Sequence, residues 1–296
     1  MIKNIIAGSK NPAFLPIKMF YYYLFNKYYE INNLIDKIQI NDDKSLYIVL
    51  KNSIKLLYKP YTLDADINFT ERYKYGQKSK MDKILNVEKY YFIYDLMHEI
   101  YVKNDYFKFF NIKTDDVVLD AGANIGLFTV LAGKKLNNTG MVIAVEPDDN
   151  NFEMLQANIE LNNLKNISPY KKGLWSKNTN LEFLIGNRPG EHSLIDNEQS
   201  SGKKVVIECV SLDSLLDTFA IPNFDFIKMD IEGAEIEVVL NSIKVLENTK
   251  TKWVIEALHS VDGVPAFKKI IPFLQKNNFK ILSEADSYRG TIYAVK

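Results

Sequence analysis

The stretch Val117-Val-Leu-Asp-Ala-Gly-Ala-Asn-Ile-Gly-Leu-Phe-Thr-Val130 predicts a buried strand, a glycine turn and the start of a helix, in that order. Apolar residues lead into Asp120, Gly122 and Gly126 follow, and a helical apolar pattern begins at Ile125. Glycine lets the backbone turn sharply and approach a ligand closely. The N-terminus of a helix presents free N–H groups to polar or anionic ligand atoms. The pattern is therefore typical of a nucleotide-like cofactor site at the carboxyl end of a first strand.

The spacing of this turn argues against a dinucleotide cofactor. The fingerprint G-x-G-x-x-G, started from Gly122, requires glycines where Asn124 and Leu127 stand. Asp120 would also repel a pyrophosphate, whereas it suits a cationic ligand such as the amino group of S-adenosylmethionine (SAM). We therefore expect Asp120, Gly122, Asn124 and Gly126 to bind SAM. The alternative is an ordinary strand–turn–helix of an α/β protein.

A second apolar run supports the cofactor interpretation. Met141-Val-Ile-Ala-Val ends in Glu146, and Pro147 follows. An acidic residue at the end of a second strand, about 20 residues past the glycine turn, can accept hydrogen bonds from ribose hydroxyls. Proline ends the strand and presets the next turn. We expect Glu146 and Pro147 to contact the cofactor; the alternative for Glu146 is a solvated strand end.

Several segments, taken in order, resemble the FkbM family of SAM-dependent methyltransferases. The similar strings are Asp-Ala-Gly-Ala-Asn-Ile-Gly from Asp120, Ala-Val-Glu-Pro-Asp from Ala144, Asn158-x-x-x-Asn162, Val210-Ser-Leu-Asp-Ser-Leu215 and Phe226-Ile-Lys-Met-Asp-Ile-Glu-Gly-Ala-Glu235. They span about 115–258, near half of the chain. The resemblance implies a class I methyltransferase, with a Rossmann-like, doubly wound, mostly parallel seven-stranded α/β sheet. It also implies O-methylation, often of sugars or glycosylated natural products, and adenine bound after the third strand, near Gly173.

Candidate catalytic residues follow from the expected sheet. Ligands of an open α/β sheet lie beyond the carboxyl ends of its strands, and Asp230 and Glu256 end the predicted fourth and fifth strands. Methyl transfer to an alcohol needs a general base or a metal that lowers the alcohol pKa. We expect Asp230, Glu256 and His259 to be the catalytic residues. In one version Asp230 or His259 is the general base; in the other, Asp230 and Glu256 bind a divalent metal. Glu232 and Glu235 are also available for this chemistry; the alternative for these two is capping of the next helix.

Alternation of strands and helices divides the chain into two regions. We expect residues 1–87 to form a small α+β accessory region, with a helix over 16–34 and strands near 38–40, 46–50 and 54–58. Residues 88–296 would form the methyltransferase domain. The helices expected in its core lie at 125–136, 150–162, 211–219, 234–246 and 265–276, with an inserted hairpin over 175–210 and a closing antiparallel pair at 279–282 and 291–295.

The amino-acid composition limits the classes of partner to expect. The 296 residues include 37 basic and 37 acidic ones, so formal net charge is zero and nothing favours a nucleic-acid partner. The N-P-P-Y-type motif of amino-group nucleic-acid methyltransferases is also missing after the fourth strand. Cys209 is the only cysteine, which excludes an internal disulfide and suits a reducing, cytoplasmic location. No segment is long and apolar enough to span a bilayer, and the aromatic run Ile17–Phe25 could contact a membrane surface, its own domain or a second copy of the chain.

The sequence thus favours a SAM-dependent O-methyltransferase acting on a carbohydrate or another small molecule. An N-methyltransferase is the enzymatic alternative, because no residue fixes the acceptor atom. A SAM-binding or scaffold protein without activity is the other, although Asp120, Gly122, Gly126, Glu146 and Asp230 together argue against it.

Overall fold

The structure is a computed structural model that describes the chain except residues 1–28, 61–86, 138, 186–202, 262 and 284–289. The expected aromatic segment at 17–25 and most of the helix expected over 16–34 lie outside the described residues. So does the tip of the hairpin expected over 175–210.

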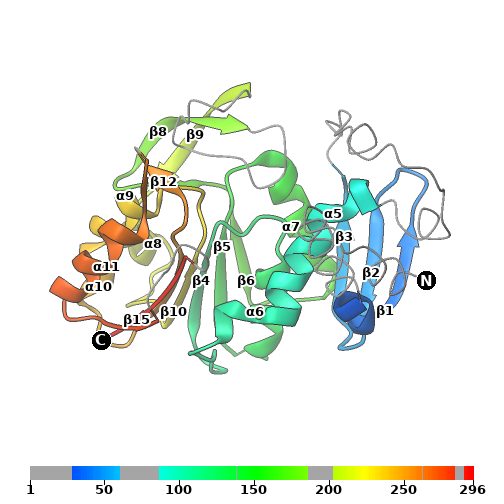
Figure 1. Cartoon of the computed structure of the whole chain (residues 1–296), viewed down its shortest axis with the longest axis horizontal. Helices are drawn as coiled ribbons and strands as arrows, with labels where there is room; N and C mark the ends of the chain where they lie inside the picture. The colour runs from blue at the N-terminus through cyan, green and yellow to red at the C-terminus, as the bar shows by residue number, and fades with distance from the viewer. Residues whose placement is uncertain (1–28, 61–86, 138, 186–202, 262, 284–289) are drawn as a thin grey trace, which may run out of the picture.

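A seven-stranded sheet forms the centre of the molecule (Figure 1), in the order β14-β15-β11-β10-β4-β5-β6. Its strands are β4 (Val117–Ala121), β5 (Met141–Val145), β6 (Ile167–Tyr170), β10 (Phe226–Met229), β11 (Lys252–Glu256), β14 (Lys280–Ser283) and β15 (Thr291–Val295). β15 runs antiparallel to both of its neighbours, and the other pairings are parallel. The predicted doubly wound, mostly parallel sheet is confirmed.

Each face of this sheet is buried under a different set of elements. Along β4, Val118 belongs to one hydrophobic core and Leu119 to the other, because successive side chains of a strand point to opposite faces. The Val118 core includes Phe128 of helix α6 (Leu127–Lys135). The Leu119 core includes residues of α8 (Leu212–Thr218), α9 (Glu235–Leu240), α10 (Ile243–Glu247) and α11 (Phe267–Lys276). Continuous apolar strand runs are thereby explained, since both faces are covered.

Two local features differ from the sequence expectation. The helix expected over 234–246 is two helices, α9 and α10, because Asn241 and Ser242 turn their side chains back onto the carbonyls of Glu237 and Val238. Before α11, the chain forms a short hairpin of β12 (Ser260–Val261) and β13 (Val264–Pro265) that the sequence did not indicate. Helix α7 (Asp149–Leu161) matches its prediction closely, and the Asp148 side chain caps its start.

The N-terminal strands form a sheet of their own in the order β1-β2-β3, namely β1 (Ile35–Ile40), β2 (Leu46–Leu50) and β3 (Lys55–Tyr58). This sheet lies beside α5 (Val87–Met97) and α7 (Figure 1). Its buried residues, such as Ile48, share one core with Phe128 of α6, which packs on the central sheet. Two short turns follow α5, the π-helical η2 (His98–Lys103) and the 3₁₀ turn η3 (Asp105–Phe107).

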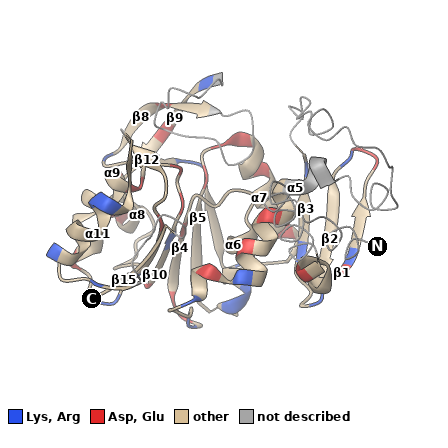
Figure 2. Ribbon diagram, viewed as in Figure 1, with Lys and Arg blue, Asp and Glu red and all other residues tan. Residues whose placement is uncertain are grey.

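A third sheet, in the order β7-β9-β8, comprises β7 (Gly173–Leu174), β8 (Thr179–Ile185) and β9 (Lys203–Val210). The antiparallel pair of β8 and β9 corresponds to the predicted hairpin. Acidic and basic residues are interspersed over the described ribbon (Figure 2). Among the described helices, none has the length and apolar character needed to cross a membrane.

Candidate active site

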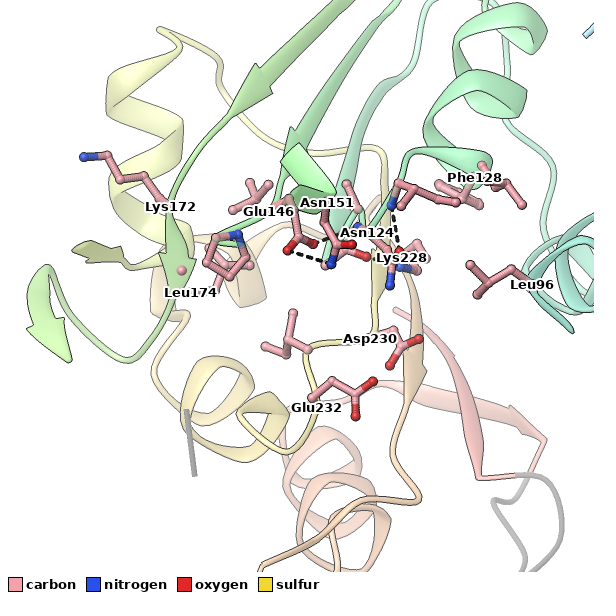
Figure 3. A pocket seen from close by; sticks show the side chains of 18 of the residues that line it. Leu96, Asn124, Phe128, Glu146, Asn151, Lys172, Leu174, Lys228, Asp230 and Glu232 are labelled. Carbon is pink, nitrogen blue, oxygen red and sulfur yellow. Dashed lines mark hydrogen bonds between the residues drawn. The ribbon is translucent and has the colours of Figure 1, made fainter. Parts of the chain in front are cut away.

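A cavity opens at the carboxyl ends of β4, β5 and β10 (Figure 3), where ligands of an α/β sheet bind. Together with the open solvent at its mouth, it holds about 850 Å³ of empty space. The turn from Gly122 to Ile125 lines it, and Glu146 lies near its middle. One end lies by Leu174, and another lies by Asp230 and Glu232. Leu96, Ile100 and Tyr106 cover it from α5, η2 and η3. The mixed polar and apolar lining is typical of a small-molecule site.

The glycine turn is fixed by conformations that few residues tolerate. Gly122 has φ +77°, and a Cβ there would overlap the carbonyl oxygen of Asp230. Gly126 has φ +88°, and a Cβ there would lie 2.6 Å from the Leu155 Cδ1. Both positions require glycine, because a side chain would be strained in φ and would clash. The turn thus brings its backbone to the cavity without side chains in the way.

Glu146 organises the middle of the cavity. Its Oε2 accepts the Asn124 N–H at 2.8 Å, and its Oε1 accepts the Asp148 N–H at 3.0 Å and the Asn151 Nδ2 at 3.4 Å. Burial raises the pKa of the carboxyl to about 7, although the backbone hydrogen bonds favour its charged form. Figure 3 shows Glu146, Asn124 and Asn151 grouped together. The carboxylate is a rigidly held acceptor at the end of the second strand.

Asp120 is fully buried and does not line the cavity. Its Oδ2 accepts the Thr129 hydroxyl at 2.5 Å, and its Oδ1 lies 3.2 Å from the Lys228 Nζ. The Lys228 ammonium in turn donates to the Gly122 carbonyl at 2.7 Å, and it does line the cavity. The cation expected beside Asp120 is therefore supplied, in this structure, by the protein. Asp120 acts on the site through Lys228 and the glycine turn.

An acidic group with one histidine lies at the other end of the cavity. Asp230, Glu232 and His259 each offer one potential metal-ligand atom, and these atoms lie within 4.8 Å of one another. Figure 3 shows the side chains of Asp230 and Glu232 next to each other. Glu232 has φ +56°, a strained conformation for a residue with a side chain, and such strain is often found at functional sites. The turn after β10 thus presents Glu232 at the cavity at a conformational cost.

His259 is held between two carboxylates. Its Nε2 lies 2.9 Å from the Glu232 Oε2, and its Nδ1 lies 3.4 Å from the Oε1 of the fully buried Glu235. Burial opposes a charge on the imidazole, but the two carboxylates outweigh burial and raise the pKa of His259 to about 11. A protonated imidazole that does not line the cavity is a poor candidate for the general base.

Further carboxylates surround this end. Glu256 is half-buried, and its Oε2 accepts the Thr291 hydroxyl at 3.0 Å. Burial, together with the nearby charge of Asp230, raises the pKa of Glu256 to about 7. Burial and the same charge raise the pKa of Glu99, whose Oε1 accepts the Tyr106 hydroxyl at 2.8 Å. Asp230 therefore lies at the centre of a set of mutually repelling acids, which favours a neutral or positively charged ligand there.

The opposite end of the cavity is more apolar. Leu174 and Phe183 line it together with Gly173 and Pro147. A Cβ at Gly173 would lie 2.7 Å from the Cys209 Sγ, so glycine is needed for β7 to pack against β9. The apolar side chains at this end suit contact with an aromatic ring.

The structure brings most of the sequence-predicted residues to one cavity. Those that line it are Gly122, Asn124, Glu146, Pro147, Gly173 and Asp230, and those that lie outside its lining are Asp120, Gly126, Glu256 and His259. Sequence reasoning assigned no role to Lys228, which lies in the buried strand Phe226–Met229. A charge inside an otherwise apolar strand must have a partner, and this signal could have identified it. Tyr106 and Glu99 carry no such signal, because they reach the site only through tertiary packing.

The chain is similar to several known methyltransferases. It is 28% identical over 177 residues to the hexuronic acid methyltransferase AglP of Haloferax volcanii. The aligned region covers 58% of this chain and 64% of AglP. It is 27% identical over 144 residues to Methyltransferase 1 of Beauveria bassiana, covering 42% and 57% of the two chains. The crystal structure of the methyltransferase FkbM from Methylobacillus flagellatus KT is 19% identical, with a TM-score of 0.47 and coverage of 64% and 46%.

The chain thus spans less than two thirds of the length of these relatives. The model of the methyltransferase FkbM domain matches residues 120–281, more than half of the chain. This match contains the glycine turn, Glu146 and the acidic group after β10. The chain belongs to the FkbM methyltransferase domain family.

Proposed function

We propose that the protein is a SAM-dependent methyltransferase that transfers a methyl group to a hydroxyl of a carbohydrate or another small molecule. The observation that carries the proposal is that one cavity is lined both by Glu146, a buried hydrogen-bond acceptor, and by Asp230, which lies within a cluster of acids. Membership of the FkbM methyltransferase domain family supports the reaction class.

SAM would lie along the cavity floor. Its ribose hydroxyls would donate to Glu146, and its adenine would lie toward Gly173, Leu174 and Phe183. The methionine part would cross the turn at Gly122, where the Lys228 ammonium offers a partner for the α-carboxylate. The sulfonium methyl would then point toward Asp230, since this is the remaining end of the cavity.

The chemistry is an in-line displacement at the methyl carbon. A hydroxyl oxygen of the acceptor forms the new C–O bond, the C–S bond breaks, and S-adenosylhomocysteine leaves as a neutral thioether. The hydroxyl proton passes to the carboxylate of Asp230, which acts as the general base and lines the cavity. Neither Glu256 nor His259 lines the cavity. We therefore propose that they hold the other side chains of the acidic end in position and do not touch the substrate.

The acidic end also fits a divalent cation. Two carboxylates and an imidazole with ligand atoms within 4.8 Å of one another are suitable ligands. Within the described part of the chain, the buried Glu235 Oε2 nearby has no hydrogen-bond partner. The expected pair Asp230 and Glu256 is replaced in this group by Asp230, Glu232 and His259. When bound, the cation would lower the pKa of an acceptor hydroxyl. Its binding would release the His259 proton and would therefore weaken at low pH.

A carbohydrate acceptor is supported by the relative named a hexuronic acid methyltransferase. The acids around Asp230 disfavour a carboxylate-bearing sugar, unless a cation neutralises them, and they accept a neutral hydroxyl. An amino sugar, which is cationic, would also suit them and would be the acceptor of an N-methyltransferase.

Turnover of methyl-labelled SAM tests the proposal. A neutral hexose glycoside, a hexuronic acid glycoside and an amino sugar glycoside would be compared, each with and without a chelator. Label transfer to the neutral hydroxyl supports O-methylation, and transfer to the amino sugar nitrogen alone would replace it by N-methylation. Full activity in chelator removes the cation. Tight SAM binding without transfer to any acceptor class would favour a SAM-binding protein without activity.

A further inference from the structure

The outer edge of β3 is paired with side chains of a helix. β3 is an edge strand of the N-terminal sheet, so the backbone groups on its outer side have no strand partner among the described residues. The Asn158 Oδ1 of α7 accepts the Leu57 N–H at 2.6 Å, and its Nδ2 donates to the Leu57 carbonyl at 3.1 Å. Asn162 makes the same two bonds to Lys55, at 3.0 and 2.7 Å. Two amides on the helix thus replace a neighbouring strand.

The spacing of the two asparagines explains this match. Residues i and i+4 of a helix lie about 6 Å apart along its axis, at about 1.5 Å per residue. Residues i and i+2 of a strand lie about 6.6 Å apart, at about 3.3 Å per residue. Asn158 and Asn162 can therefore each reach the backbone of one residue, Leu57 and Lys55. A third contact continues the row, since the Lys59 N–H lies 3.3 Å from the Met154 Sδ.

Asn158 makes one contact that Asn162 does not. Its Nδ2 also donates to the Ile125 carbonyl at 2.8 Å, whereas the Nδ2 of Asn162 donates a second bond to the Asn158 carbonyl of its own helix. Ile125 lies in the glycine turn and lines the cavity. Asn158 is fully buried. Its amide connects β3 directly to the cofactor turn, because it bonds to both Leu57 and Ile125.

We propose that Asn158 is a positioning residue for the cofactor turn, and that it couples the docking of the N-terminal sheet to the binding of SAM. The inference rests on the proposed function for the identity of the ligand. Its structural part, the control of the turn at Ile125 by β3, stands without the ligand.

The coupling follows from hydrogen-bond satisfaction. Each buried polar group prefers a partner, and Asn158 satisfies three backbone groups at once, two on Leu57 and one on Ile125. When β3 is docked, both ends of the Asn158 amide are fixed, and the Ile125 carbonyl has a donor in a set position. When β3 separates, the amide can rotate, and the turn loses that constraint. Coupling is reciprocal, so SAM must also hold β3 more firmly.

Matched variants test the proposal. Asn158→Leu and Asn162→Leu each remove two side-chain bonds to β3. Asn162→Leu leaves the Asn158 bonds to Leu57 and Ile125 in place, so β3 stays docked at Asn158, whereas Asn158→Leu removes both. We expect the Kd for SAM, measured by calorimetry, to rise about tenfold in Asn158→Leu and less than about twofold in Asn162→Leu. Hydrogen exchange of the amides at 122–126 should quicken in the first variant alone. Equal changes of SAM affinity and of turn exchange in both variants would overturn the proposal.

A second measurement needs no variant. In the native chain, SAM should slow hydrogen exchange of the Leu57 amide on β3 more than that of the Gln39 amide on β1, which has no bond to α7 among those described. Equal responses at the two amides would contradict the coupling. If the native chain binds no SAM, the proposed function fails, and turn exchange in the two variants still decides the role of Asn158.

Discussion

Lys228 and Asp120 stand in register on the neighbouring strands β10 and β4, with the Lys228 Nζ 3.2 Å from the Asp120 Oδ1. Both side chains are almost completely buried, with exposed fractions of 6% and 0%. The Lys228 ammonium also donates to the Gly122 carbonyl, so the pair ties two strands and the cofactor turn together. Burial raises the pKa of Asp120, and Lys228 and Thr129 oppose this shift. The pair is therefore a structural support of the turn.

Lys228→Met should destabilise the fold by about 3–5 kcal/mol, because it leaves the Asp120 carboxyl buried without its cation. Urea unfolding would measure this. The double variant Asp120→Asn/Lys228→Met should be less destabilised than the sum of the single ones, since the pair acts as a unit. Lys244→Met is the control, because Lys244 pairs on the surface with Asp217, and it should change stability by less than about 0.5 kcal/mol. A loss below about 1 kcal/mol for Lys228→Met would contradict this account.

SAM affinity should depend on pH through Glu146. Because burial raises the pKa of this carboxyl from 4.5 to about 7, the folded chain holds the proton more tightly than the unfolded one. The resulting stabilisation is complete below about pH 4.5 and is lost as the pH rises through about 7. The ionised form is the stronger acceptor for ribose hydroxyls, so SAM should bind about tenfold more tightly at about pH 8 than at about pH 6.

Calorimetry at a series of pH values would measure this dependence. Glu146→Gln should bind SAM weakly, and its affinity should not depend on pH in this range. Glu256, whose pKa burial also raises to about 7, does not line the cavity, so Glu256→Gln should keep the native pH profile of binding. A flat profile in the native chain would show that Glu146 does not meet the ribose as an anion.

Asp230→Asn should lower the turnover number about 10²–10⁴-fold, because an amide cannot take the acceptor proton. Its Kd for SAM should change less than about fivefold, since the amide keeps the shape of the carboxylate. Asp217→Asn, at an exposed position on α8, should leave both quantities unchanged. Steady-state kinetics with labelled SAM would measure the effect; turnover at the native rate would remove Asp230 from catalysis.

The sequence predicted the parts of this molecule that local patterns control. Apolar runs ending in Glu146 or Asp230 located strand ends, and the sheet rule then brought them to one cavity. The break between α9 and α10 was missed because it depends on where the Ser242 hydroxyl turns. The partner of Asp120 was missed for a different reason. Lys228 is 108 residues away in the chain, and only the register of β10 on β4 makes the two neighbours.

The string Asn158-x-x-x-Asn162 shows the same limit. Its spacing was visible in the sequence, but its partners Leu57 and Lys55 belong to another sheet. A side-chain amide can pair with any exposed backbone edge, so spacing alone cannot name that edge. The roles of residues that act through tertiary contacts could be identified only from the structure.

The most direct test of the central claim is a calorimetric titration of SAM into the native chain, Gly122→Ala and Gly263→Ala. Both glycines have positive φ, but a Cβ at Gly122 would overlap the Asp230 carbonyl, whereas nothing lies within 4 Å of a Cβ at Gly263. The account predicts saturable binding of one SAM to the native chain and to Gly263→Ala, and at least about 100-fold weaker binding to Gly122→Ala. Equal SAM binding by all three proteins, or binding of NAD in place of SAM, would contradict it.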